Sequence, residues 1–251
     1  MKLAVTGKGG VGKTTVVAGL ARVLTDRGQK VLVIDADPAS NLALALGFPQ
    51  DQRLKPISEM KELIEERTEA KSGSMGSFFK LNPRVDDLPD QYSLEKDGIR
   101  MMVMGTVKKG GGGCVCPENV MLKNLVAHLL LGRDEVVILD MEAGVEHLGR
   151  ATAKAVNKLV VVVEPGQRSL EVAQKIRQLA SDIGLDNIGL VGNKIRNEAD
   201  REFLLKRMPD LPFLGFISYD SKVVEADLSG IPPFVGNPEF LTSMGAIVDR
   251  L

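Results

Sequence analysis

The sequence predicts an α/β fold in which a doubly wound, mostly parallel sheet carries helices on both faces. Apolar, β-branched runs alternate with amphipathic stretches from one end of the 251 residues to the other. The runs are continuous rather than alternating with polar residues, as in strands covered on both faces. Helical stretches separate the strands, which is the order that builds parallel sheets. We expect strands at Lys2–Thr6, Lys30–Asp35, Ile99–Met104, Glu135–Asp140, Lys158–Val163, Asn187–Gly192 and Pro212–Ile217.

Helical periodicity fills most of the intervals between these strands. The order is interrupted by an irregular insertion at about residues 48–113, where a surface helix at Ile57–Ala70 precedes loops rich in Gly, Ser, Pro and Asp. We therefore expect one domain over residues 1–251. The remaining helices are expected at Lys13–Asp26, Pro117–Leu131, Glu146–Val156, Arg168–Ile183, Glu198–Arg207 and Pro238–Leu251.

Composition and charge exclude several classes of protein. The 32 Lys and Arg residues almost balance the 33 Asp and Glu residues, whereas dedicated nucleic-acid binders usually carry a basic excess. The two cysteines cannot supply a disulfide framework. The sequence shows neither a secretory leader nor a run of about 20 apolar residues. It therefore predicts a cytoplasmic protein that binds neither nucleic acid nor a membrane.

A glycine-rich loop joins the first predicted strand to the first predicted helix and fits the phosphate-binding pattern G-x-x-x-x-G-K-[ST]. Glycines let successive backbone N–H groups converge on phosphate oxygens, and the helix N-terminus adds partial positive charge. Lys13 is expected to reach the β- and γ-phosphates, and the Thr14 hydroxyl to bind Mg²⁺. We therefore predict a P-loop nucleotide-hydrolysing fold. The loop consists of Gly7, Lys8, Gly9, Gly10, Val11, Gly12, Lys13, Thr14 and Thr15.

Polar side chains also follow other predicted strands. Asp35 and Asp37 flank a single residue, so on a continuing strand both carboxylates would point to one side and could share a cation. Asn193 follows the strand at 187–192, and Arg196 stands where a guanine site would need an acceptor. Because a guanidinium only donates hydrogen bonds, adenine is the preferred base and ATP the predicted nucleotide.

Two cysteines, Cys114 and Cys116, lie between a run of four glycines and Pro117, which suits the first turn of a helix. They could be small buried side chains, a redox pair or metal ligands. A helix N-terminus lowers the pKa of a thiol and favours the thiolate that binds metals. One C-x-C supplies two sulfurs, whereas a soft four-coordinate site needs more ligands. A two-fold homodimer would bring four sulfurs together on its axis.

The loop K-G-G-V-G-K-T-T, with D-A-D-P at 35–38 and D-M-E-A-G at 140–144, resembles the deviant Walker A loop and switches of the MinD/ParA/nitrogenase iron protein group. The resemblance implies that Lys8 reaches across a homodimer to the partner's nucleotide and acts like an arginine finger. It further implies that Asp37 orients the attacking water near Mg²⁺. Asp140 would hold Mg²⁺ through water, the Gly144 N–H would meet the γ-phosphate, and Asn193 would contact the base.

Within that group, the whole chain resembles the CooC-type nickel-insertion ATPases that serve carbon monoxide dehydrogenase. The resemblance includes the K-K-G-G…C-x-C-x-E-N segment at Lys108–Asn119 and the D-M-x-A-G-x-E-H segment at Asp140–His147. It implies an ATPase that uses ATP, ADP and Mg²⁺. It also implies Ni²⁺, with Zn²⁺ as the alternative, shared across the homodimer by Cys114 and Cys116. The implied client is a nickel enzyme of the carbon monoxide dehydrogenase or acetyl-CoA synthase type.

Two other functions on this fold stay open as alternatives. A nitrogenase-type electron-transfer ATPase places a cluster-binding cysteine in switch II, but Asp140–Gly144 contains none. A MinD- or ParA-like positioning ATPase needs a basic membrane helix or a basic DNA-facing surface. The sequence closes on Asp249-Arg250-Leu251 without such a helix, and its net charge of −1 offers no support for DNA.

Glu146 and His147 follow the second switch and have two interpretations. They could couple the nucleotide state to the metal or the client. Alternatively, they form a capped helix start with a histidine on the surface. His128, in the helix after the cysteines, is expected to be packed or solvated and is not among the predicted ligands.

Overall fold

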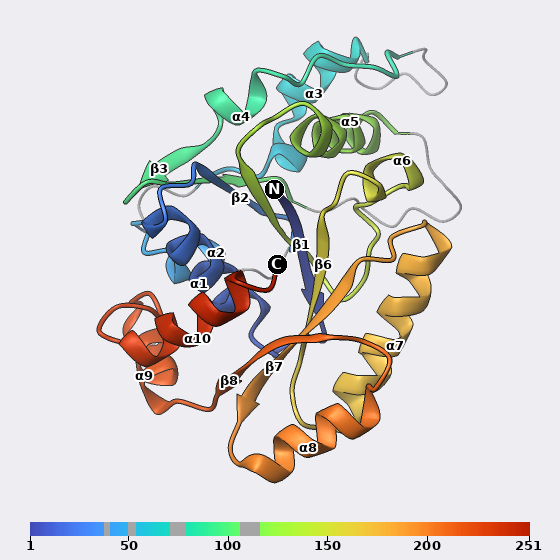
Figure 1. The fold of residues 1–251 in the computed structure, drawn as a ribbon. Helices are drawn as coiled ribbons and strands as arrows, with labels where there is room; N and C mark the ends of the chain where they lie inside the picture. Colours follow the sequence, from blue (N-terminus) through green and yellow to red (C-terminus); the bar gives the residue numbers. More distant parts are fainter. Residues whose placement is uncertain (38–40, 50–53, 71–78, 106–115) are drawn as a thin grey trace.

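The computed structural model describes residues 1–37, 41–49, 54–70, 79–105 and 116–251. Within these ranges eight strands form one sheet in the order β3-β4-β2-β5-β1-β6-β7-β8 (Figure 1). Strands β2 to β5 lie on one side of β1 and β6 to β8 on the other, which is the doubly wound arrangement. The strands are β1 (Lys2–Gly7), β2 (Val31–Asp35), β3 (Leu94–Lys96), β4 (Ile99–Val103), β5 (Val136–Asp140), β6 (Lys158–Val163), β7 (Ile188–Ile195) and β8 (Phe213–Ser218).

Strand pairing is parallel in this sheet, except that β3 pairs with β4 in antiparallel fashion. The register sets Val5 of β1 and Asp35 of β2 opposite Asp140 of β5. The carboxyl ends of these central strands therefore meet at one edge of the sheet. In doubly wound folds, ligands bind at this edge, where the strand order reverses.

Both faces of the sheet are buried, which explains the continuous apolar runs. Along β1, Leu3 and Val5 pack on one face and Ala4 on the other. Figure 1 shows α1 and α10 on one side of the sheet and α5 and α7 on the other. The helices are α1 (Lys13–Asp26), α2 (Leu42–Ala45), the 3₁₀ helix η1 (Ile57–Glu59), α3 (Lys61–Thr68), α4 (Leu88–Gln91), α5 (Pro117–Leu131), α6 (Arg150–Ala153), α7 (Gln167–Asp182), α8 (Glu198–Arg207), α9 (Ser221–Ser229) and α10 (Pro238–Val248).

The predicted fold class is confirmed, and each predicted strand is present with its ends shifted by at most three residues. Two predicted helices were wrong in extent. The helix predicted at Glu146–Val156 is the single turn α6, because residues 141–149 run as bends and turns before it. The helix predicted at Ile57–Ala70 breaks at Met60 into η1 and α3.

The segment predicted as loops, Lys71–Gly98, contains α4 and β3, while its residues 71–78 lie outside the described ranges. The structure also has α2 and α9, which the sequence did not predict. None of the helices in the described part of the chain has both the length and the apolar character needed to span a bilayer.

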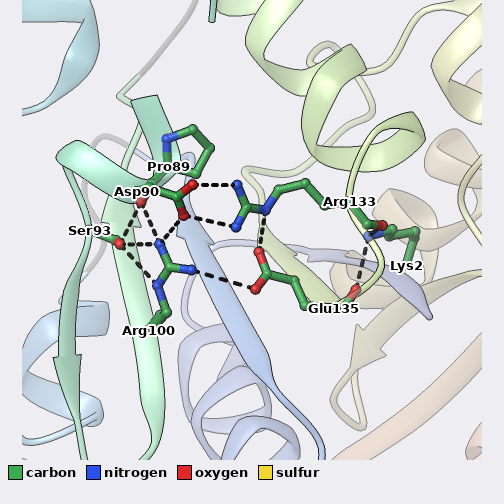
Figure 2. Close-up of polar contacts among 7 residues, drawn as sticks. All are labelled: Lys2, Pro89, Asp90, Ser93, Arg100, Arg133 and Glu135. Carbon is green, nitrogen blue, oxygen red and sulfur yellow. Dashed lines mark hydrogen bonds and ion pairs between the residues drawn. The ribbon is translucent and has the colours of Figure 1, made fainter. Parts of the chain in front are cut away.

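A network of charged side chains fastens the opposite edge of the sheet, where the central strands begin (Figure 2). Arg133 donates to both oxygens of Asp90 and to Glu135. Arg100 lies 2.8 Å from Asp90 and 3.6 Å from Glu135, and Lys2 donates to the backbone oxygens of residues 133 and 135. The network joins β1, β4 and the α5–β5 turn to α4.

Candidate nucleotide site and cysteine segment

The glycine-rich loop leaves β1 at Gly7 and enters α1 at Lys13. Gly10 and Gly12 have left-handed backbone angles, with φ of 79° and 93°, which residues with a Cβ rarely adopt. A Cβ at Gly12 would also overlap the Asn193 side chain. The first turn of α1 has no acidic residue, so the partial positive charge of its N-terminus is not offset there. The loop therefore has the form that holds phosphate groups.

Lys13 and Asp37 lie together at the mouth of this loop. The Lys13 ammonium is buried and lies 3.5 Å from the Asp37 carboxylate. Asp37 does not continue β2 as predicted. The strand ends at Asp35, whose carboxylate accepts a hydrogen bond of 3.2 Å from the Asp37 N–H. This turn explains why the Asp37 carboxylate faces the loop lysine.

Thr14 and Asp140 are brought together from α1 and β5. The Thr14 hydroxyl donates a hydrogen bond of 2.9 Å to the Asp140 carboxylate, and Asp140 is fully buried. A hydroxyl and a carboxylate are the hard oxygen donors that Mg²⁺ prefers. These residues therefore fit the ion that the sequence predicts, with Asp37 and Lys13 beside them.

The second switch, residues 140–144, is hydrogen-bonded to Thr6 of β1, a residue that the sequence did not single out. The fully buried Thr6 hydroxyl donates to the Glu142 backbone oxygen at 2.5 Å and accepts from the Gly144 N–H at 3.1 Å. The Gly144 N–H thus has a partner in this structure, and its contact with a γ-phosphate stays a prediction. A hydroxyl in the otherwise apolar first strand was the signal that could have identified Thr6.

Lys8 is bonded within its own chain. Its ammonium lies 3.1 Å from one oxygen of Glu164, and the Lys194 ammonium lies 3.0 Å from the other. Lys194 also donates to the Gly10 backbone oxygen at 2.6 Å. Although burial raises the pKa of Glu164, the hydrogen bonds from Lys194 and Lys8 outweigh it and hold that pKa below its usual value. Glu164 follows β6 without any motif around it, so the sequence alone gives no signal for it.

Asn193 lies beneath the loop, at the end of β7. Its amide donates to the Val11 backbone oxygen at 2.8 Å and accepts from the Lys194 N–H at 2.9 Å. The amide nitrogen therefore braces the loop while the amide oxygen caps the next residue of β7, and the predicted contact with the base stays a prediction. A cavity of about 330 Å³ is lined by Gly10 and Gly12 of the loop and by Val223 and Asp227 of α9, a helix that the sequence did not predict.

His147 is buried, with 9% of its surface exposed, so the expectation of a surface histidine at a helix start was wrong. Burial lowers the pKa of His147, while the negative charges of Glu146 and Asp37 act in the opposite direction. Its Nε2 atom has no hydrogen-bond partner among the described residues. Whether Glu146 and His147 couple the switch to a metal or client stays a prediction.

Cys116 is the residue at which α5 begins, followed by Pro117 in the first turn. It is half-buried, and its backbone oxygen accepts a hydrogen bond from the Val120 N–H. The partial positive charge of the helix N-terminus favours the thiolate there. Cys114 lies outside the described residues. Over the described ranges, no group of three or more His, Cys, Asp or Glu side chains is arranged to hold a metal.

Comparison with known proteins gives one consistent result. Residues 2–234 match the family model described as the CobQ/CobB/MinD/ParA nucleotide binding domain. The chain is 49% identical to the carbon monoxide dehydrogenase accessory protein CooC of Rhodospirillum rubrum, over 92% of this chain and 88% of that protein. It is 47% identical to an uncharacterized ATP-binding protein of Methanocaldococcus jannaschii, over 92% and 90%.

Solved structures share the fold at much lower sequence identity. The MinC:MinD cell division complex of Aquifex aeolicus matches with a TM-score of 0.72 at 19% identity, covering 99% of this chain and 94% of that chain. MinD of Pyrococcus horikoshii, determined with Mg-ADP, matches with a TM-score of 0.65 at 22% identity, covering 99% and 95%. The same arrangement of strands and helices is thus present in proteins that share only about a fifth of their residues with this chain.

Proposed function

Because the chain belongs to the CobQ/CobB/MinD/ParA nucleotide-binding family and, within it, to the CooC-type ATPases, we propose that it couples ATP hydrolysis to nickel delivery. The client is a carbon monoxide dehydrogenase or a nickel enzyme of the acetyl-CoA synthase type. The observation that carries this proposal is the 49% identity over 92% of the chain to an accessory protein of carbon monoxide dehydrogenase. The proposed location is the cytoplasm.

The chain is an ATPase, and its reaction adds water to the γ-phosphate of ATP to give ADP and phosphate. The loop N–H groups and Lys13 bind and orient the phosphate chain, and Asp37, 3.5 Å from Lys13, orients the attacking water and accepts its hydrogen bond. Thr14 and Asp140 would hold Mg²⁺, which neutralises charge on the β- and γ-phosphate oxygens.

Lys8 completes the site in a second copy of the chain. One-third of its side chain is exposed, and it belongs to the loop rather than to the buried end of α1. In the proposed homodimer, Lys8 of each copy approaches the nucleotide of the other and stabilises the charge that develops on the transferred phosphoryl group. Hydrolysis followed by release of phosphate leaves ADP without the group that Lys8 contacts, and this loosens the dimer.

The cargo is Ni²⁺, held by Cys114 and Cys116 of both copies. Support comes from the position of Cys116 at the start of α5, where a thiolate is favoured. Four thiolates on a two-fold axis also accept Zn²⁺, which is the competing ion. Because binding is reciprocal, nickel should also favour the dimer.

The test is anaerobic size exclusion with metal analysis, with and without ATP and Ni²⁺. The proposal predicts about one Ni²⁺ per dimer, lost when both cysteines are replaced (Cys114→Ala with Cys116→Ala). The matched control is Val115→Ala, which alters the residue between them and leaves both sulfurs. Unchanged nickel binding by the double variant would contradict the assignment.

The two alternatives give different results with the same preparation. A positioning ATPase would sediment with liposomes or DNA in the presence of ATP and show no metal dependence. An electron-transfer ATPase would be brown after anaerobic purification and absorb visible light. Either result would replace the nickel proposal.

A further inference from the structure

We propose that Glu164 holds Lys8 inside its own chain until a second copy and its nucleotide draw the lysine away. This inference rests on the proposed function, because it assumes that Lys8 acts across a homodimer. It makes Glu164 a positioning residue that sets how readily the active dimer forms. Lys8 lies 3.1 Å from one Glu164 oxygen in the structure, so the lysine has to exchange partners before it can reach another chain.

The position of Glu164 is fixed by its backbone. It follows β6, the neighbour of β1 in the sheet, and its N–H is 3.0 Å from the buried Ser169 hydroxyl, in the first turn of α7. The carboxylate is about three-quarters buried. A carboxylate on such a frame offers Lys8 a defined position rather than one of many surface contacts.

Lys194 lowers the free-energy cost of releasing Lys8 from Glu164. It occupies the second oxygen of Glu164 at 3.0 Å and also donates to the Gly10 backbone oxygen at 2.6 Å. When Lys8 leaves, the partly buried carboxylate keeps a cationic partner, so no unpaired charge is created. The loop also keeps its contact through Gly10. Lys8 can therefore move without disturbing the site that binds nucleotide.

The balance of charges gives the direction of the exchange. In the structure, the Glu164 carboxylate faces two ammonium groups beside the loop. A partner's ATP offers Lys8 several negative charges in a more enclosed setting, where each interaction is stronger. A partly exposed ion pair is worth only a few-fold in an equilibrium constant. Glu164 thus raises the protein concentration at which the dimer forms, without preventing its formation.

The experiment measures ATP hydrolysis and sedimentation of the full-length chain as a function of its own concentration. For Glu164→Gln, the protein concentration at half-maximal specific activity should fall about 3- to 5-fold, with the maximal specific activity unchanged. Glu164→Asp keeps the charge on a side chain shorter by one methylene, which weakens the contact with Lys8 without removing it, and should give a smaller fall. Asp249→Asn is the matched control for a lost charge. It removes an exposed pair with Arg27 at the far end of α1. The protein concentration at half-maximal specific activity should therefore stay unchanged.

Separate outcomes distinguish this inference from the function on which it rests. If Lys8→Ala abolishes hydrolysis but neither Glu164 variant moves the midpoint, the proposed function stands and the role of Glu164 is wrong. A fall in maximal activity with an unmoved midpoint would also contradict it, since that result indicates a merely structural role. If Lys8→Ala hydrolyses ATP normally, the shared site fails, and the holding role of Glu164 fails with it.

Discussion

The sheet has a starting edge, where the central strands begin, and a finishing edge, where they end. These two edges carry charge networks of opposite character. At the edge where the strands begin, Arg133 and Arg100 bind Asp90 and Glu135 through several atoms each (Figure 2). At the edge where the strands end, lysines make the contacts, and Lys8 and Lys194 share the single carboxylate of Glu164.

Side-chain chemistry explains this difference. A guanidinium is a planar fork that fixes the direction of its partner, whereas an ammonium is a point charge that can exchange one acceptor for another. Arg133 and Glu135 are only 15% and 10% exposed, against 33% for Lys8. The starting edge is therefore built to stay in place, and the finishing edge to change partners when a nucleotide arrives.

The largest expected effect is on catalysis at the finishing edge. Lys8→Ala should lower the rate of ATP hydrolysis by on the order of 10³-fold, as removal of an arginine finger does. Its free energy of unfolding should change by less than about 1 kcal/mol, because the Lys8–Glu164 pair is partly exposed. Phosphate release and urea denaturation measure the two quantities. A large loss of stability would break the contrast between the two edges.

The next effect is on stability at the starting edge. Arg133→Met should lower the free energy of unfolding by about 2 kcal/mol, because mostly buried Glu135 loses its closest partner. Hydrolysis per folded molecule should not change. The control is Arg177→Met, which removes an exposed pair with Asp210 and should cost less than about 0.5 kcal/mol. If both variants cost the same in urea denaturation, the fixed character of this edge is refuted.

The smallest effect concerns pH. Hydrogen bonds from Arg133 and Arg100 hold the pKa of Asp90 below its usual value. A carboxyl whose pKa is lowered by folding adds stability above its unfolded pKa of about 3.9 and loses it as the pH falls further. Asp90 is 60% exposed, so screening limits the contribution to a few tenths of a kcal/mol.

The measurement compares the wild-type chain with Asp90→Asn by thermal melting across pH. The difference between the two should be constant above about pH 5 and fade below about pH 4. A difference that grew as the pH fell would mean that the Asp90 pKa is raised by folding instead.

The sequence predicted most of the sheet because its strands are long, apolar and buried on both faces. It missed β3, where Leu94–Lys96 has only three residues and no apolar run. It also missed α9, which buries none of its residues and so has no strong apolar stripe. The helix predicted from Glu146 onward was too long, since tertiary contacts such as the bond from Thr6 to Glu142 shape the segment before α6.

The candidate site was predictable where a motif determines the backbone, as in the loop that ends with Lys13 and Thr14. Pairings between motifs were only partly predictable. Thr14 and Asp140 meet because β1, which leads through the loop into α1, lies beside β5, which ends at Asp140. The Asp35–Asp37 turn, by contrast, replaced a continuing strand. Glu164 gave no signal, because its importance comes from β6 lying beside β1, which is a property of the sheet order.

The central claim is that Lys8 acts on the nucleotide of a second copy, and mixed dimers test it most directly. Lys8→Ala and Asp37→Asn chains, each inactive alone, are combined in equal amounts, with different tags to confirm that mixed dimers form. In a mixed dimer, the Lys8→Ala copy keeps Asp37 and receives Lys8 from its partner. The account predicts recovery of about one quarter of the wild-type rate, since half of the dimers are mixed and each has one complete site. Mixed dimers with no activity above that of the separate variants would contradict it.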